Sequence, residues 1–283
     1  MASIVVTGSQ GKLGRAVVER LLAEGHAVHG LDSQPATPGF GYTRIDLTDA
    51  GQVLDAMFGV QDRYDTVDAL VHLAAIPAPG QASDVAVFHN NMLATFNVFQ
   101  AARRAGVTNV VYASSETVLG LPFETPPPYI PVDEEYDARP ESNYSLVKHL
   151  EEQMAIQLCR WDPELKIVAL RFSNVIYAEE YSVFPAFDAD PKARRWNLWG
   201  YIDARDGAQA VVRALAYEPR GFDRFIIANA DTVMSRSSAD LAAAEFPDVP
   251  VVKELGEHET MLSIDKARRL LGYEPEFTWR DAV

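Results

Sequence analysis

Hydrophobic positions along the first two-thirds of the chain form short runs rich in β-branched residues, separated by longer stretches with helical spacing. This alternation is typical of a parallel sheet whose strands are joined by crossover helices. The expected strands are residues 3–6, 26–31, 69–73, 109–113, 166–171 and 225–228. The expected helices are residues 14–24, 52–58, 85–105, 143–160, 206–217 and 263–271. The pattern therefore predicts an α/β fold.

Two stretches interrupt this alternation. Residues 121–140 contain six prolines and are expected to form a loop, while residues 175–199 are irregular and rich in aromatic side chains. Long loops that follow strand ends are where α/β folds bind their substrates. The last third of the chain is expected to complete the sheet and to form a small lid.

Composition and charge exclude several classes of protein. The 283-residue chain has 48% hydrophobic and 23% charged residues, an ordinary globular composition. A net charge of −15 with scattered basic residues argues against nucleic acid as a partner. Apolar runs are too short to span a membrane, so no membrane contact is expected. The single cysteine, Cys159, excludes an internal disulfide and fits a reducing compartment, so the expected location is cytoplasmic.

A glycine-rich turn joins the first expected strand to the first expected helix. Gly8 permits a tight turn, Gly11 lets the backbone approach a diphosphate, and Gly14 lets the helix pack closely on the strand. Lys12 and Leu13 lie at the helix N-terminus, where free N–H groups and the helix dipole favour an anion. An ordinary strand-to-helix turn is the alternative, but the elements on both sides favour dinucleotide binding.

Asp32 ends the second expected strand, eighteen residues after Gly14. A carboxylate at this position accepts hydrogen bonds from the adenine ribose hydroxyls and repels the 2′-phosphate of NADP. Asp32 could instead be a turn residue, and Lys12 could reach a 2′-phosphate, but the pattern favours NAD. It predicts a Rossmann-type doubly wound parallel sheet over residues 1–174. Residues 175–283 are expected to form a small C-terminal substrate-binding lid, interleaved with the last sheet elements.

Tyr144 and Lys148 are four residues apart on an expected helix, so both side chains leave the same face. A phenol is a poor base at neutral pH, but a neighbouring ammonium group stabilises the phenolate and lowers its pKa. Tyr144 could then take a proton from a substrate hydroxyl while hydride moves to a nicotinamide. This spacing also arises by chance in helices. Ser114 and Ser115, at the carboxyl edge of the expected sheet, favour the catalytic interpretation.

These motifs, in this order, resemble the extended short-chain dehydrogenase/reductases, which are also described as NAD-dependent epimerases and dehydratases. The resemblance covers nearly the whole chain and includes the stretches at residues 72–75 and 171–175. It implies that Ser115, Tyr144 and Lys148 are catalytic and that NAD is the cofactor. The further cofactor-binding residues that it implies are Asp46 and Leu47 beside the adenine, Leu73, Ala74 and Ala75 beside the phosphates and ribose, Asn91 towards the active-site end, and Ser114.

The substrate is suggested by what the chain lacks. Between Val175 and Tyr201 there are too few residues for the nucleotide-binding insertion of nucleotide-sugar epimerases and dehydratases. In this respect the chain resembles uronate dehydrogenases, which oxidise free sugar acids. That resemblance places Arg194 where a substrate carboxylate binds, and Asn174 near the substrate. Glu116 replaces a neutral polar residue, and it would either repel an acid or accept hydrogen bonds from a neutral sugar.

The sequence thus predicts an NAD-dependent oxidoreductase that transfers hydride between nicotinamide and a secondary alcohol or ketone of a small sugar or sugar acid. A nucleotide-sugar epimerase or dehydratase is the enzymatic alternative, although the acidic pair of the dehydratases is reduced here to Glu116. A non-catalytic dinucleotide sensor is the alternative from another class, and Tyr144 with Lys148 argues against it. The expected partner is a small molecule, a homodimer is left open, and no metal site is expected.

Overall fold

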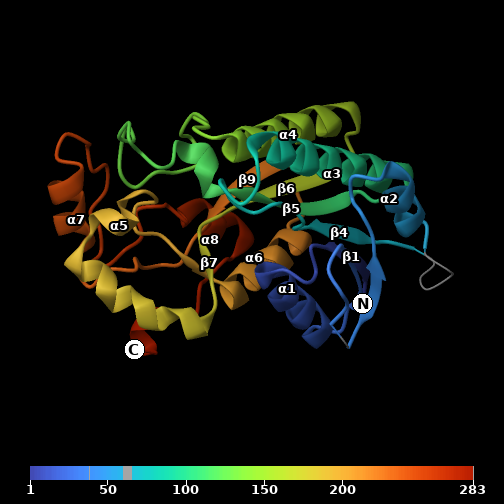
Figure 1. Ribbon diagram of the computed structural model, residues 1–283, viewed down its shortest axis with the longest axis horizontal. Helices are drawn as coiled ribbons and strands as arrows, with labels where there is room; N and C mark the ends of the chain where they lie inside the picture. Colours follow the sequence, from blue (N-terminus) through green and yellow to red (C-terminus); the bar gives the residue numbers. More distant parts are fainter. Residues whose placement is uncertain (38, 60–65, 283) are drawn as a thin grey trace.

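A seven-stranded parallel sheet forms the centre of the molecule in the computed structural model, which describes residues 1–37, 39–59 and 66–282 (Figure 1). Its strand order is β3-β2-β1-β4-β5-β6-β9, and the direction of winding reverses between β1 and β4. The strands are β1 (Ser3–Thr7), β2 (Ala27–Asp32), β3 (Gly41–Arg44), β4 (Ala69–His72), β5 (Asn109–Ser115), β6 (Lys166–Phe172) and β9 (Gly221–Ile227). This is the Rossmann-type doubly wound sheet that the sequence predicts, so the fold class is confirmed.

Helices cover both faces of the sheet (Figure 1). On one face α2 (Ala50–Met57), α3 (Asp84–Arg104) and α4 (Asn143–Trp161) lie side by side. On the other face α1 (Lys12–Ala23) packs against α6 (Ala204–Ala216). Because both faces are covered, β6 is buried along its whole length, which explains its continuous hydrophobic run. Within the described ranges, no helix has the length and apolar character that a membrane span needs.

The chain after β6 builds a second packing region at one end of the sheet, where the yellow and red segments gather in Figure 1. Besides α6 and β9, it contains β7 (Val175–Ile176), η3 (Ala178–Ala189), α5 (Lys192–Arg195), β8 (Ile202–Asp203), α7 (Ser238–Glu245), α8 (Asp265–Leu271) and η4 (Trp279–Asp281). Tyr181, Phe184, Tyr201 and Trp279 pack edge to face there, with ring centroids 5.2–6.2 Å apart. The aromatic side chains of this region are therefore largely packing residues, and they belong to the same hydrophobic core as this face of the sheet.

Each expected strand and helix has a counterpart, but the structure adds elements that the hydrophobic pattern does not predict. β3 lies at the sheet edge with no fully buried residue, so it carries no hydrophobic run. The helices α5 and α7 are only 4 and 8 residues long, too short for a clear helical period. The strand expected at residues 225–228 begins earlier, at Gly221. Its first four residues are only half-buried, so the hydrophobic pattern does not reveal them.

Candidate cofactor and catalytic site

A cavity of about 920 Å³ opens along the carboxyl ends of β1, β2, β4, β5 and β6, where doubly wound folds bind ligands. Most residues predicted for the site line this cavity. They are Gly8, Gly11, Lys12, Leu13, Gly14, Asp32, Asp46, Leu47, Leu73, Ala74, Ala75, Ser114, Ser115, Glu116, Tyr144, Lys148 and Asn174. Asn91 and Arg194 are not among the lining residues.

The glycine turn has the shape that a diphosphate needs. Gly8 has φ +69°, and a Cβ on Gly14 would lie 2.0 Å from the Gly8 carbonyl oxygen, so packing within the protein requires both glycines. Gly11 differs, because a Cβ there would meet only the Gly8 carbonyl oxygen, at 3.3 Å. Gly11 also precedes α1 without any side-chain cap. The bare N-terminus of α1 therefore fits the diphosphate of NAD, which Gly11 allows to approach.

Asp32 lies at the end of β2 on the wall of the cavity. Its carboxylate accepts hydrogen bonds from the backbone N–H groups of Gln10, at 2.9 Å, and Gln34, at 3.0 Å. These bonds fix a negative charge beside the glycine turn. The arrangement fits an adenine ribose with free hydroxyl groups and opposes a 2′-phosphate.

Lys12 is not free to bind a 2′-phosphate, because its ammonium group already has partners within the protein. Its Nζ atom lies 2.6 Å from Glu180 Oε2 and donates to the carbonyl of Val175 at 3.2 Å. The ammonium also lies 5.2 Å from the centre of the Tyr177 ring. Lys12 thus ties the glycine turn to the chain after β6, and its charge is already paired with a carboxylate.

Asn91 supports the cavity from behind. It is fully buried on α3, where its side-chain amide donates to the carbonyl of Ile76 at 3.0 Å and accepts from the Ile76 N–H at 2.8 Å. In the structure Asn91 therefore binds the loop after β4 and does not line the cavity. Its contact with the cofactor stays a prediction. The neighbouring Asn90 lines the cavity instead.

Ser115, Tyr144 and Lys148 meet at the centre of the cavity, and all three are buried. Ser115 is the last residue of β5, while Tyr144 and Lys148 stand one turn apart near the start of α4. The side chain of Ser142 caps this helix and fixes where its first turn begins. Lys148 Nζ donates to the Ala113 carbonyl at 2.9 Å, which holds the lysine against the end of β5.

The electrostatics of Tyr144 differ from the expectation. Burial raises the pKa of Tyr144 above its ordinary value, while the charge of Lys148 and a hydrogen bond with Ser115 lower it. Nearby carboxylates of Glu151 and Glu116 raise it further. The sequence argument includes the lysine alone, so it gives the correct sign for Lys148 but the wrong net direction.

Glu116 lies at the opposite end of the cavity from Asp32, directly after Ser115. Its side chain is 3% exposed, and burial raises the pKa of Glu116 to about 7, against the lowering effects of its polar neighbours. Asn197 Nδ2 donates to Glu116 Oε1 at 3.2 Å and to the Gly200 carbonyl at 2.9 Å. Asn197 Oδ1 is buried without a hydrogen-bond partner among the described residues, while Ser173 interacts with Glu116 and lowers its pKa. Of this buried cluster, Glu116 and Ser173 line the cavity, whereas Asn197 lies behind its wall.

Arg194 lies behind this cluster and does not reach the cavity wall. It is 8% exposed, donates from Nη2 to the Gly200 carbonyl at 2.8 Å, and stacks 5.1 Å from the Trp196 ring centre. Its charge lowers the pKa of Glu116. The structure thus places Trp196 at the wall and Arg194 in the layer beneath, because α5 turns the guanidinium toward the protein interior.

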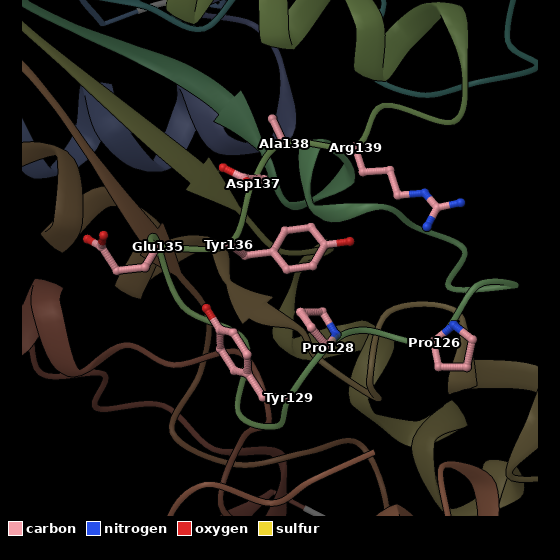
Figure 2. Close-up of a pocket in the computed structure, with 8 residues that line it drawn as sticks. All are labelled: Pro126, Pro128, Tyr129, Glu135, Tyr136, Asp137, Ala138 and Arg139. Atoms are coloured by element: carbon pink, nitrogen blue, oxygen red, sulfur yellow. The ribbon is translucent and has the colours of Figure 1, made fainter. Parts of the chain in front are cut away.

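A second, smaller hollow lies on the proline-rich segment between η2 (Glu116–Leu119) and α4. Its volume is about 430 Å³, and Figure 2 shows its lining residues on two neighbouring stretches of this segment. Tyr129 and Tyr136 stand within it, and the Tyr129 hydroxyl donates to Asp133 Oδ1 at 2.7 Å. None of the predicted site residues lines this hollow. The large cavity is therefore the candidate site.

Comparison with known proteins identifies the family. The model of the NAD dependent epimerase/dehydratase family matches residues 4–228, which is most of the chain. The chain belongs to this family. The predicted resemblance, the enzyme class and NAD as the cofactor are thereby confirmed.

The curated relatives include several UDP-glucose 4-epimerases. UDP-glucose 4-epimerase 3 of Oryza sativa subsp. japonica is 30% identical over 216 residues, which cover 71% of this chain and 56% of that protein. UDP-glucose 4-epimerase of Caenorhabditis elegans is 27% identical over 222 residues, which cover 70% of this chain and 60% of that protein. The aligned chain thus spans 56–60% of the length of these relatives.

Solved structures resemble the chain over its whole length. A short-chain dehydrogenase/reductase superfamily protein from Agrobacterium tumefaciens with bound NAD is 26% identical, with a TM-score of 0.73 and coverage of 98% of this chain and 94% of that one. A mutated uronate dehydrogenase is 22% identical, with a TM-score of 0.68 and coverage of 100% and 85%, and shows the shared fold alone.

Sequence reasoning missed Asn197 and Glu151, two buried polar residues of the site. Asn197 follows α5 in the irregular segment and reaches Glu116 across 81 positions of the chain, so no local motif marks it. Glu151 carries a weak signal, because it stands three residues after Lys148 and therefore on the same side of the helix.

Proposed function

We propose that this protein is an NAD-dependent oxidoreductase acting on a secondary alcohol or ketone of a small, neutral, hydroxyl-rich molecule such as a free sugar. The cavity holds a dinucleotide-binding end beside Asp32 and a short polar end beside Glu116. Ser115, Tyr144 and Lys148 line the same cavity, with Ser115 directly before Glu116 at the end of β5. This arrangement suits hydride transfer between a bound nicotinamide and one substrate carbon.

The observation that carries the small-substrate proposal is the composition of the cavity wall. Of the described residues after Asn174, only Val175 and Trp196 line the cavity. Other large side chains of that region, such as Tyr181 and Trp279, are buried and pack against Phe184. The cavity volume of about 920 Å³ already lies at the upper end of the roughly 300–1,000 Å³ that is typical of single-ligand sites. A nucleotide-linked sugar would need a second nucleotide pocket beside the NAD site, and this cavity leaves little room for one.

The chain's own residues supply the proton chemistry. When bound, NAD accepts or supplies the hydride. Tyr144 takes the proton of the substrate hydroxyl during oxidation and returns it to the carbonyl oxygen during reduction. The Ser115 hydroxyl accepts from Thr117 at 3.0 Å, and its own hydrogen bond with Tyr144 lowers the pKa of that phenol, so Ser115 holds Tyr144 beside the reacting oxygen. Lys148 stabilises the phenolate form of Tyr144 by its positive charge.

The charge at the substrate end favours a neutral molecule over a sugar acid. Glu116 is on the cavity wall, whereas Arg194 lies beneath it and donates to the Gly200 carbonyl. A substrate carboxylate would meet Glu116 before it met the guanidinium. A hydroxyl group carries no charge and can both donate and accept a hydrogen bond, so it suits a cavity wall that contains the Glu116 carboxyl group.

A substrate screen tests the proposal. The purified protein with NAD is given neutral aldoses, polyols and uronates, and NADH formation is followed, while interconversion of UDP-glucose and UDP-galactose is assayed in parallel. We expect NADH from one or more neutral sugars and weaker turnover of the matching uronate. Conversion of UDP-sugars without net NADH would favour the epimerase alternative. NAD binding without turnover of any compound would favour a dinucleotide sensor.

Two further expectations accompany this proposal. We propose that residues 175–283 form a small substrate-binding lid interleaved with the last sheet elements, and that the protein works in the cytoplasm. Sedimentation of the purified protein tests whether it forms a homodimer.

A further inference from the structure

A buried chain of polar side chains runs from Lys148 to the first strand. Lys148 Nζ donates to Glu151 Oε2 at 2.8 Å, and Glu151 Oε1 accepts from Thr95 Oγ1 at 2.7 Å. Thr95 Oγ1 lies 3.0 Å from His72 Nε2, and His72 Nδ1 lies 2.7 Å from Thr7 Oγ1. All five side chains are at most 3% exposed. The chain thus crosses from α4 through α3 and β4 to β1 without contact with water.

The direction of every hydrogen bond in this chain follows from the chemistry of its members. Burial, with the nearby charge of Lys148, lowers the pKa of His72 to about 3, so the imidazole is neutral and donates from one nitrogen only. Thr95 has a single hydroxyl proton, which goes to the Glu151 carboxylate. Thr95 must therefore accept from His72 Nε2–H, and His72 Nδ1 must accept from the Thr7 hydroxyl.

The far end of the chain touches the cofactor cavity. Thr7 Oγ1 accepts from the backbone N–H groups of Leu73 at 3.2 Å and Ala74 at 3.4 Å. Leu73 and Ala74 line the cavity. The hydrogen-bonded chain thus begins at the loop that lines the cofactor cavity and ends at one buried carboxylate, Glu151. The same carboxylate binds Lys148.

Glu152, the next residue, shows that burial of a carboxylate on α4 does not by itself make this connection. Its Oε2 lies 2.7 Å from Arg171 Nη2, and its Oε1 accepts from the Ser114 hydroxyl at 2.7 Å. Glu152 therefore pairs with a cation in the sheet, while the only ion pair of Glu151 among the described residues is with Lys148.

We propose that Glu151 is a positioning residue that holds the Lys148 ammonium beneath Tyr144 and couples it, through Thr95 and His72, to the loop that lines the cofactor cavity. This inference rests on the proposed roles of Tyr144 and Lys148. Buried charge networks of this kind hold one geometry because each member would otherwise lack a partner.

The charges around Glu151 give the proposal a pH signature. The titratable groups that face the pair are Tyr144 and Glu152 on α4, His72 on β4 and Tyr112 on β5. Burial lowers the pKa of Lys148 and is the largest single influence on it, but Glu151, Tyr144 and Glu152 together raise it, so the net direction is upward. Glu151 also raises the pKa of Tyr144. Removal of this one charge should lower both pKa values.

Glu151→Gln removes the charge and keeps the shape. During oxidation, turnover rises with pH as Tyr144 loses its proton, so this limb should move to lower pH by about one unit. A second, falling limb should appear at alkaline pH, because Lys148 then loses its proton earlier. Calorimetry without substrate should show NAD affinity falling several-fold over the same alkaline range. Glu164→Gln removes an exposed carboxylate beyond the end of α4 and should leave all of these unchanged.

Thr95→Val tests the coupling separately. It keeps the Lys148–Glu151 pair but removes the hydrogen bond to His72. NAD affinity should therefore fall several-fold at all pH values, while the pH profile of turnover stays as it is in the unmodified protein. Glu151→Asp, which keeps the charge on a shorter arm, should restore the normal pH profile and serves if Glu151→Gln does not fold.

Each result supports or overturns a defined part of the proposal about Glu151. If Glu151→Gln folds and keeps the pH dependence of both turnover and NAD binding, or if Thr95→Val binds NAD normally, the positioning role is wrong. Tyr144→Phe is measured alongside, because full activity in that variant overturns the proposed mechanism instead. The calorimetric result does not depend on turnover and separates the two failures.

Discussion

The two ends of the cavity are built by different means. The end beside Asp32 is formed by backbone: the glycine turn, the N-terminus of α1 and the loop after β4. Its few side chains are already hydrogen-bonded within the protein, as Asp32 is to two N–H groups. The end beside Glu116 depends on side chains from distant segments, since Asn197 donates to Glu116 across 81 positions of the chain. The first end therefore holds one ligand of fixed shape, while the second is free to specify a substrate.

The largest expected effect concerns proton transfer, which can be separated from ligand binding at either end of the cavity. Tyr144→Phe removes only the hydroxyl group that moves the proton, so turnover should fall by roughly 10²–10⁴-fold. NAD affinity should change little, since the ring still fills the same space. Steady-state kinetics and calorimetry measure the two quantities. A variant that kept most of its turnover would show that Tyr144 is not the proton-transfer group.

The second prediction contrasts two glycines of the backbone-built end. Gly14→Ala places a Cβ 2.0 Å from the Gly8 carbonyl oxygen, so it should lower the free energy of unfolding by about 3 kcal/mol. Gly11→Ala meets the same oxygen at 3.3 Å and should fold nearly normally, yet bind NAD about tenfold more weakly. Denaturant unfolding and calorimetry distinguish the two. Equal losses of stability would mean that Gly11 is also required by packing.

The same contrast explains what the sequence could predict. The glycine turn, Asp32 and the Tyr144–Lys148 pair depend on local geometry, which residue spacing within one turn or helix reveals. The positions of Asn197 and Arg194 depend on how the irregular segment folds onto Glu116, and no period encodes that. Strand β3 was hidden for a related reason, because an exposed edge strand has no buried run.

The net pKa direction of Tyr144 could not be predicted for a different reason. It depends on burial and on carboxylates that approach from η2 and from the buried face of α4. Spacing along α4 identifies Lys148 as a neighbour but says nothing of depth. Electrostatics at a buried site thus requires the packed structure, even where the catalytic residues themselves are evident from the sequence.

The third prediction tests the side-chain-built end through stability. Burial raises the pKa of Glu116 to about 7, from an ordinary 4.5. The protonated carboxyl group therefore favours folding below pH 4.5, and this contribution is lost as pH rises through 7. Glu116→Gln cannot ionise, so relative to the unmodified protein it should gain roughly 2 kcal/mol of unfolding free energy between pH 5 and pH 9.

Denaturant unfolding at the two pH values measures this gain. Glu164→Gln, an exposed carboxylate, is the matched control and should show no pH-dependent difference. If Glu116→Gln and the unmodified protein differed equally at pH 5 and pH 9, burial would not raise the pKa of Glu116 and this prediction would be wrong.

The smallest expected effect concerns Lys12, which begins α1 and contacts the chain after β6 through Val175 and Glu180. Its partner Glu180 is 43% exposed and Lys12 itself 36%, so water screens the pair, and Lys12→Ala should cost less than about 1 kcal/mol of unfolding free energy. Because the ammonium faces Glu180 and the Val175 carbonyl, the preference for NAD over NADP should stay the same. Asp32→Ala, by contrast, should narrow that preference, since it removes the charge that opposes a 2′-phosphate. Calorimetric titration of both cofactors compares the variants. A clear change of preference in Lys12→Ala would place its ammonium with the backbone-built end, against the contacts seen in the structure.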